Sequence, residues 1–549
     1  MDWQRNVLLA AIFAVFAVLF VRWNEFSEAR LPKQITATND AVYVPESPAP
    51  AVAVVPSATD VGGTVVKNPT KADSSERLIR VKTDVLDLVI DTRGGDIVRA
   101  TLPKYPAELS KDSPPFLMLN RTRDQIYVAQ SGLIGPSGTD RAEERPQFVA
   151  ERVDYTLNGA AELHVPLSYH QGEVLITKEF VLRQGSYLID VVYHVDNRGT
   201  SPWTGRMFGQ IQRDSHNPAP ASNAFGMKSY LGAALSTQEE NYRKVKFDDL
   251  NKKPFETERT GGWIAMVQHY FVSAWIPEQT ASNHFKLRRL GENDLYALGF
   301  IGPERSVEPG KSERFSAGFY VGPKDQAHLG EIAPHLELTI DYGWLWWIAK
   351  PVFAGLQLLH GWFGNWGWAI IAITVLLKLA FFPLSAASYR SMARMRKLQP
   401  EMQSLRERYG ADRQQLSQEV MALYKREKVN PMGGCLPMLI QMPVFIALYW
   451  VLSESIELRH APWILWITDL SVRDPLYVLP VLNGISMFVL QTLQPAPPDP
   501  TQAKVMKVMP LMFSFFFVFF PAGLVLYWTV NSVLSIAQQW VITRRIIAE

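Results

Sequence analysis

Residues 366–385 read WGWAIIAITVLLKLAFFPLS, and this stretch decides the architecture. From residue 368 to 384 every side chain is apolar except Thr374 and Lys378. A helix of this length can cross a bilayer, and its tryptophans mark one membrane interface. The sequence therefore predicts a transmembrane helix over residues 366–388.

Lys378 lies well inside that predicted span. A charge near the centre of a membrane helix costs about 2.5–3.5 kcal/mol even on insertion scales, so it usually marks a functional site. Thr374, Phe381 and Ser385 share its face of a helix by their spacing. Snorkelling to the headgroups is the simpler alternative, but Arg390 lies about 18 Å further along a helix, beyond the reach of a lysine stem. We favour a wet, protein-lined site.

Composition limits the class of protein. The chain has 549 residues, a net charge of +2 and 47% hydrophobic residues. Its length is too great for a single domain. The small net charge argues against a nucleic-acid binder. A single cysteine, Cys435, excludes an intramolecular disulfide, and no cysteine–histidine cluster indicates a metal or cofactor. The longest apolar runs lie towards the two ends, which indicates a soluble domain carried between membrane segments.

The first half is expected to form an anchor, a tether and a β domain. Residues 1–23 contain an apolar run with no good cleavage site after it, which favours a signal-anchor helix over a cleaved signal peptide. Residues 24–76, rich in Pro, Ala, Val, Thr and Ser, are expected to form a disordered tether. Residues 77–335 carry short β-branched runs separated by glycine turns, which predicts a large antiparallel all-β domain. His194 and His269 within it are expected to be structural.

A helical region follows the predicted β domain. Residues 336–365 hold several tryptophans and an apolar stripe at helical spacing, which predicts an amphipathic helix in the membrane interface. Residues 389–430 predict a helical hairpin with a break at Pro400 and with Asp412 as the cap of its second helix. Between positions 390 and 428 there are ten Lys or Arg against five acidic residues, which places the hairpin in the cytoplasm. An ordinary solvated surface and a docking surface for a partner explain this excess of basic residues equally well.

Four further apolar spans complete the expected membrane core. They cover residues 435–453, 476–491, 506–521 and 523–542, and residues 543–549 form a short tail. The basic residues of the connecting loops place both termini in the cytoplasm and the β domain outside.

Polar residues recur inside these spans. Trp528, Asn531 and Ser535 share a stripe on the last span, and Gln441 lies between two prolines of an earlier one. Such side chains often only tie helices together. A membrane lysine needs polar neighbours, however, so we infer a hydrophilic cavity. Its expected lining residues are Thr374, Lys378, Asn531 and Ser535.

A soft apolar face rich in Met and Phe accompanies this cavity. Lipid contact and core packing explain most of its residues. The candidates for contact with a passing apolar segment are Met442, Phe445, Met509, Phe513 and Phe516.

Two blocks resemble the YidC family of membrane protein insertases in its Gram-negative form. Residues 428–445 read KVNPMGGCLPMLIQMPVF and residues 520–528 read FPAGLVLYW. The resemblance implies a β-supersandwich for the external domain, joined to an anchor helix and a five-helix core. It also implies a groove that opens to the cytoplasm and the lipid and is closed to the outside.

The resemblance assigns residues to that groove. The family's groove threonine falls on Thr374, and its central basic residue, usually arginine, falls on Lys378. The aromatic partner on the last helix falls on Trp528 or Tyr527, and substrates are expected on the spans of Gln441 and Phe516. The implied partners are nascent membrane proteins, the Sec translocon with its accessory subunits, membrane lipid, and ribosomes or targeting factors at the hairpin.

We therefore expect a non-enzymatic insertase and chaperone of the bacterial inner membrane. A secondary transporter would show paired repeats, which the five core spans lack. An intramembrane protease would need a Ser/His or double-Asp site, and the five core spans contain neither His nor Asp. A scaffold for the β domain would lose its function if residues 80–320 were deleted, whereas an insertase core should survive much of that deletion.

Overall fold

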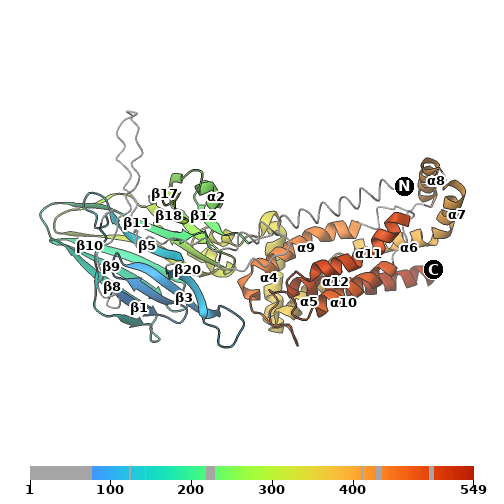
Figure 1. The fold of residues 1–549 in the computed structure, drawn as a ribbon, viewed down its shortest axis with the longest axis horizontal. Coiled ribbons are helices and arrows are strands. Elements are labelled where there is room, and N and C mark those ends of the chain that lie inside the picture. The colour runs from blue at the N-terminus through green and yellow to red at the C-terminus, as the bar shows by residue number, and fades with distance from the viewer. Residues whose placement is uncertain are drawn as a thin grey trace, which may run out of the picture.

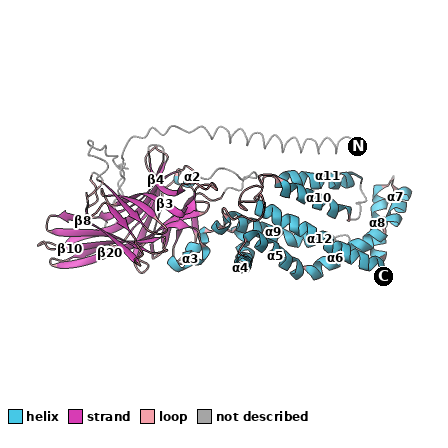
Figure 2. Ribbon diagram, turned by 90° about the horizontal axis from the view of Figure 1, so that it is seen from below, coloured by secondary structure: helices cyan, strands magenta, loops and turns pink. Residues whose placement is uncertain are grey.

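The computed structural model describes residues 77–122, 125–141, 144–217, 229–410, 412–427, 436–493 and 500–548. The expected anchor at 1–23 and tether at 24–76 lie outside these residues, as do residues 428–430 of the predicted hairpin and residue 435 of the next predicted span. The described chain forms a β domain at one end and a helical region at the other (Figure 1). The hairpin of helices α7 (Gln399–Tyr409) and α8 (Arg413–Arg426) lies at the end farthest from the β domain (Figure 2).

The β domain is a sandwich of two large sheets. An 11-stranded sheet has the order β14-β17-β18-β11-β5-β4-β3-β2-β1-β7 with β19 beside β11, and a 9-stranded sheet has the order β13-β12-β15-β16-β20-β10-β9-β8-β6. The described pairs are antiparallel apart from β1 with β7, which are parallel. The strands of the first sheet are β1 (Leu78–Lys82), β2 (Asp87–Asp91), β3 (Asp96–Pro106), β4 (Pro115–Arg121), β5 (Ile126–Ile134), β7 (Asp154–Thr156), β11 (Trp203–Asp214), β14 (Phe255–Thr260), β17 (Ser282–Arg289), β18 (Leu295–Ile301) and β19 (Arg305–Val307). Those of the second are β6 (Val149–Ala150), β8 (Glu162–Gln171), β9 (Val174–Arg183), β10 (Leu188–Asn197), β12 (Gly232–Ser236), β13 (Arg243–Val245), β15 (Trp263–Val267), β16 (Phe271–Ile276) and β20 (Lys311–Pro323). The expected antiparallel all-β domain is confirmed, with that one parallel pair added.

Alternating side chains build the core between the two sheets. In β1, Ile79 and Val81 point inward while their neighbours are exposed. Strand β15 instead is apolar and buried along its whole length. Ile264 and Met266 face the sandwich core, whereas Trp263 faces the helical region. Both faces of this strand are therefore covered, which explains why its sequence does not alternate.

Short helices lead from the sandwich into the helical region. They are α2 (Phe247–Leu250), α3 (Gln326–Ile332), and the 3-10 turns η1 (Leu336–Thr339) and η2 (Gly343–Leu345). Helix α4 (Trp346–Phe363) buries Val352, Leu356 and Leu359, three positions of the predicted apolar stripe, and exposes several tryptophans. The amphipathic helix predicted within residues 336–365 is confirmed, and its place in a membrane interface stays a prediction.

The helix expected over residues 366–388 is bent. Helix α5 (Trp366–Ala380) ends at Phe381, and α6 (Phe382–Lys397) starts there at an angle of 66°. Pro383 explains the break, because it has no N–H to donate and its ring would clash with the carbonyl of Leu379 in a continuous helix. The segment predicted as one helix over residues 366–388 is therefore helical on both sides of a bend at Phe381, and its crossing of a membrane stays a prediction.

The remaining helices follow the predicted spans with shifted ends. They are α9 (Leu436–Glu454), η4 (Ile456–Leu458), α10 (Val478–Thr492), α11 (Pro500–Phe517) and α12 (Ala522–Ala548). Within the described residues, no single helix has both the length and the apolarity to cross a membrane alone, whereas the bent pair α5–α6 meets these criteria together. In the hairpin, α7 begins beside Pro400 and Asp412 caps α8, so the predicted break and cap are confirmed.

The loop between α9 and α10 is fastened to the turn between α11 and α12. The amide of Ala522 donates to Val472 O at 2.7 Å, and that of Gly523 donates to Leu470 O at 2.9 Å. Arg473 also forms a β-bridge with Pro521. These contacts lie on the side of the helical region that faces the β domain, and they hold the ends of three helices together.

Candidate functional site: a hollow around Lys378

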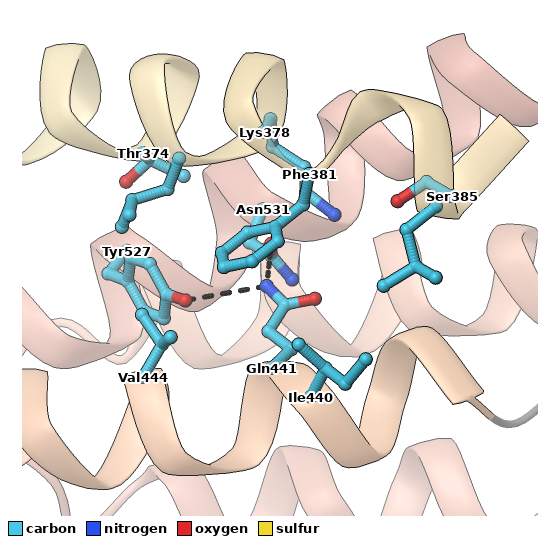
Figure 3. A pocket seen from close by; sticks show the side chains of 11 residues that line it. Thr374, Lys378, Phe381, Ser385, Ile440, Gln441, Val444, Tyr527 and Asn531 are labelled. Carbon is cyan, nitrogen blue, oxygen red and sulfur yellow. Dashed lines mark hydrogen bonds between the residues drawn. The ribbon is translucent and has the colours of Figure 1, made fainter.

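One hollow lies among the bent pair α5–α6, helix α9 and helix α12 (Figure 3). It encloses about 410 Å³ that protein atoms leave empty, counting the part that is open to the outside. Its lining residues are Thr374, Leu377, Lys378, Phe381, Leu384, Ser385, Ile440, Gln441, Val444, Tyr527 and Asn531. The bend at Phe381 wraps the chain around the hollow, so that residues on both sides of the break line it.

Lys378 is the charged residue of this lining. Its side chain is only 8% exposed, and its Nζ donates a hydrogen bond of 2.7 Å to Ser535 Oγ. Ser535 Oγ in turn donates to the backbone oxygen of Asn531 at 2.8 Å. Among the described residues, no carboxylate forms an ion pair with this ammonium. A nearly buried positive charge is therefore held by a hydroxyl on the last helix.

A second set of polar groups joins α9 to α12. The amide nitrogen of Gln441 donates to Asn531 Oδ1 and, at 3.4 Å, to Tyr527 Oη (Figure 3). Thr374 also faces the hollow, but its hydroxyl donates to Ile370 O of its own helix at 2.6 Å. The amide and phenol groups therefore give the hollow a polar wall opposite Lys378, while Thr374 contributes little free polarity.

The end of α5 nearest the β domain is fixed by local sequence. The side chain of Asn365 accepts hydrogen bonds from the amides of Gly367 and Trp368, which caps the helix. Its own amide donates to the backbone oxygens of Pro462 and Trp463 in the loop after α9. A Cβ at position 367 would lie 2.0 Å from the Trp463 ring, so glycine is required there. Trp463 therefore packs directly on the first turn of α5.

The structure brings together most of the residues that the sequence singled out. Thr374, Lys378, Gln441, Tyr527 and Asn531 line one hollow, and Ser535 contacts it through Lys378. The apolar lining from Leu377, Leu384, Ile440 and Val444 was not predicted. Leu377 lies three residues after Thr374, and Leu384 lies three residues after Phe381, so both lie near the predicted stripe. For Ile440 and Val444, nothing in the sequence indicated which face of α9 would point inward.

Trp528 lies elsewhere. Its ring packs against Phe445 and Phe517, with centroids 4.6 and 5.6 Å away, and it does not line the hollow. Of the two aromatic candidates on the last helix, Tyr527 is therefore the one in the site. The reason is the helical rotation of about 100° between adjacent residues, which turns Trp528 towards α9 and α11.

The candidate apolar face is divided by the structure. Phe445, Phe513 and Phe516 pack on the helical core as partly buried residues. Met442 is 41% exposed, and Met509 is half-buried. Packing therefore accounts for the three phenylalanines, while the two methionines leave surface that another chain or lipid can contact.

Comparisons with known proteins cover the whole chain. Residues 78–354 match the family model described as YidC periplasmic domain, and residues 358–549 match the one described as 60Kd inner membrane protein. The membrane protein insertase YidC of Cellvibrio japonicus is 54% identical over 553 residues, which cover 100% of this chain and 99% of the relative. The YidC of Stutzerimonas stutzeri is 50% identical over 554 residues, with coverage of 100% and 99%.

Among solved structures, an active YidC insertase with its first transmembrane domain resolved covers 85% of this chain and 92% of its own. Its sequence identity is 18% and its TM-score is 0.38. Two family matches that together span residues 78–549, and full-length relatives at 50–54% identity, leave one assignment. The chain belongs to the YidC family of membrane protein insertases, which are inner-membrane proteins with a periplasmic domain and are not enzymes.

Proposed function

We propose that the hollow around Lys378 is the route by which this insertase admits polar parts of a substrate into the membrane. The observation that carries the proposal is a nearly buried ammonium, bonded to Ser535, that faces Gln441 and Asn531 across one hollow. A positive charge in a low-dielectric setting attracts acidic or polar segments strongly. Such a site shortens the apolar path that these segments must cross, and it needs no nucleotide and no covalent intermediate.

The apolar part of the substrate would leave sideways. Met442 on α9 is exposed beside the hollow, and Met509 on α11 is half-buried. Methionine side chains adapt to partners of varied shape. We therefore propose that a substrate helix passes along α9 and α11 into lipid once its polar end occupies the hollow.

The proposed topology is a multi-pass protein with both termini in the cytoplasm. The excess of basic residues in the hairpin supports this orientation. The hairpin would then meet ribosomes or targeting factors, and the protein would work alone or with the Sec translocon and its accessory subunits. The names of the relatives specify none of these partners. The proposal of these partners rests on the resemblance of the sequence to the YidC family.

Charge reversal at the hollow tests the route. Lys378→Glu is expected to lower insertion of substrates with acidic translocated segments by about tenfold or more, because a carboxylate there repels them. Lys378→Arg, which keeps the charge, should retain most of the activity. The measurement is insertion of a protease-accessible reporter in cells depleted of their own insertase.

Lys350→Glu is the matched control, because Lys350 lies on α4 away from the hollow. It should insert the reporter like the parent protein. Photo-crosslinking a stalled nascent chain should label positions 374, 378 and 441 more strongly than 528, since Trp528 does not line the hollow. Full activity of Lys378→Glu, or a reversed crosslinking order, would refute the route.

A further inference from the structure

A buried ion pair joins the β domain to the helix that forms one wall of the hollow. Glu454 is the last residue of α9, and Lys324 follows the last residue of β20. Lys324 Nζ lies 3.0 Å from Glu454 Oε2, and the two side chains are only 1% and 2% exposed. This pair links positions 130 residues apart in the sequence.

Several further bonds hold the same end of α9. Ser229 Oγ donates to Glu454 Oε1 at 2.8 Å, and Lys324 Nζ also donates to the backbone oxygen of Thr339 at 3.4 Å. His269 Nε2 lies 2.7 Å from the backbone oxygen of Ser453. The charged pair is therefore supported by hydrogen bonds, which a buried pair needs to offset desolvation.

The chain just beyond α9 enters the β domain itself. Ile456 belongs to the core between the two sheets, and Arg459 donates to the backbone oxygens of Pro106 and Ala107 at 2.7 and 2.9 Å. The guanidinium of Arg459 also lies over the rings of Phe116 and Phe271. The end of α9 and the chain that follows it are therefore fixed to the β domain.

That end is connected to the site by a single helix. Gln441 lies on α9 about 20 Å from Glu454 at the usual helical rise, and it bonds Asn531 across the hollow. The chain between these residues is one helix that contains Pro443, so a shift at Glu454 moves the wall that carries Gln441. Helix α9 also packs on α4 and α12, and both of these helices pack on α5, so the width of the hollow depends on how α9 sits against them as well as on its fixed end.

We propose that Lys324 of the β domain is a positioning residue for insertion: its ion pair with Glu454 sets the place of α9 and hence the width of the hollow. This inference rests on the proposed function. Loss of one partner leaves the other charge buried without compensation, whereas loss of both leaves none. The contribution to insertion therefore depends on charge balance, and a double replacement should rescue a single one.

Spin-label distances test the position of α9 without an activity assay. Labels at Leu379 on α5 and Met442 on α9, both exposed, report the width in a Cys435→Ser background that removes the natural cysteine. We expect Lys324→Met to broaden or shift this distance distribution. The Lys324→Met/Glu454→Leu pair should restore the parent distribution, and so should Lys324→Arg.

In variants without spin labels, we expect insertion to change in parallel with the distance between α5 and α9. We expect Lys324→Met to lower reporter insertion about fivefold or more, and the double variant to return within about twofold of the parent. Lys286→Met is the matched control, because it removes an ion pair of 2.7 Å with Glu256 that is partly exposed in the same domain. It should change neither readout. If Lys324→Met does not accumulate, Glu454→Gln takes its place, since it removes the opposite charge and keeps the shape.

The outcomes separate the two proposals. An unchanged distance distribution in Lys324→Met, or a double variant that is no closer to the parent than the single one, overturns the role of the ion pair. Distances that respond as expected with full insertion confirm that the pair positions α9 and overturn the hollow as the route. Loss of insertion with unchanged distances assigns Lys324 another role and overturns this inference.

Discussion

Lys378 and Ser535 define how the site handles charge. An ammonium offers three donors, and the structure describes one of them bonded to a hydroxyl at 2.7 Å. Where relatives are expected to carry arginine, lysine provides a compact charge without a planar fork. If Lys378 receives substrates as proposed, their recognition should depend on charge and little on geometry.

Glu457 gives a second residue-scale prediction, in the loop after α9. Burial, together with the neighbouring Asp325 carboxylate, raises the pKa of Glu457 from 4.5 to about 7. The folded protein then binds a proton that the unfolded chain releases between these values. This group therefore contributes stability below pH 4.5, and the contribution is lost as the pH rises through 7.

Glu457→Gln should remove that dependence. A shift of this size corresponds to about 3 kcal/mol, so the variant should unfold at a higher temperature than the parent at pH 8 and differ little at pH 4.5. The measurement is thermal unfolding of the full chain in detergent at both pH values. An equal change in unfolding temperature at the two pH values would show that the carboxyl is not protonated in the fold.

The bend between α5 and α6 is the element that shapes the hollow. Its two helices meet at 66° next to Pro383, and residues from both of them line the site. A straight helix would carry Ser385 away from Lys378's surroundings along the axis of α5. The break therefore converts a stripe on one helix face into a curved wall.

Pro383→Ala should relax this bend, because alanine restores an N–H donor and removes the clash. From the helical rise, the Cα distance between positions 368 and 390 is about 28 Å in the bent pair and about 33 Å in a straight helix. Spin labels at these two exposed positions measure the change, and insertion should fall with it. Pro351→Ala in α4 is the control for loss of a helix proline, and an unchanged distance would assign the bend to tertiary packing.

Elements were predictable where one local rule dominated. Proline 400 and Asp412 marked a helix break and a cap, and both are found. The short β-branched run of β1 predicted a strand, and helical spacing placed Lys378 and Ser385 in one site. The same proline rule at Pro383 was outweighed by the long apolar run, so the bend was missed. Hydrophobicity shows that a segment is buried, but it does not show whether the segment is straight.

Contacts between residues far apart in the chain could not be predicted from the sequence. The 130-residue separation of Lys324 and Glu454, and the parallel pairing of β1 with β7, are set by tertiary contacts that no local pattern encodes. For the same reason the inward face of α9, with Ile440 and Val444, could not be chosen beforehand. The polar members of the site were predictable because polarity within an apolar span is rare, whereas apolar members do not differ from their surroundings.

At the scale of the whole molecule, the two parts share a core. Trp263 and Val272 of the second sheet belong to the same buried cluster as Leu356 of α4 and Leu448 of α9. The β domain therefore covers apolar surface of the helical region, and it is not merely suspended from it. This arrangement links the stability of one part to that of the other.

Deletion of residues 80–320 tests this linkage. It removes Trp263, Val272 and most of the strand before Lys324 but keeps Lys324, Glu454 and the hollow, so we expect insertion to persist at a reduced level while the unfolding temperature falls by several degrees or more. The measurements are reporter insertion and thermal unfolding in detergent. If the deletion protein still accumulates but no longer inserts the reporter, the helices would instead serve as a scaffold for the β domain.

The fastened turn at Pro521 has a consequence for the energy state of the cell. Val472 and Leu470 hold the start of α12, and Trp463 closes the end of α5 against Gly367. If the hollow is the route proposed above, contacts that hold this side of the bundle together would oppose a continuous aqueous pore, and few protons or other small ions would leak while a polypeptide enters. The transmembrane voltage would then remain available to pull acidic segments outward.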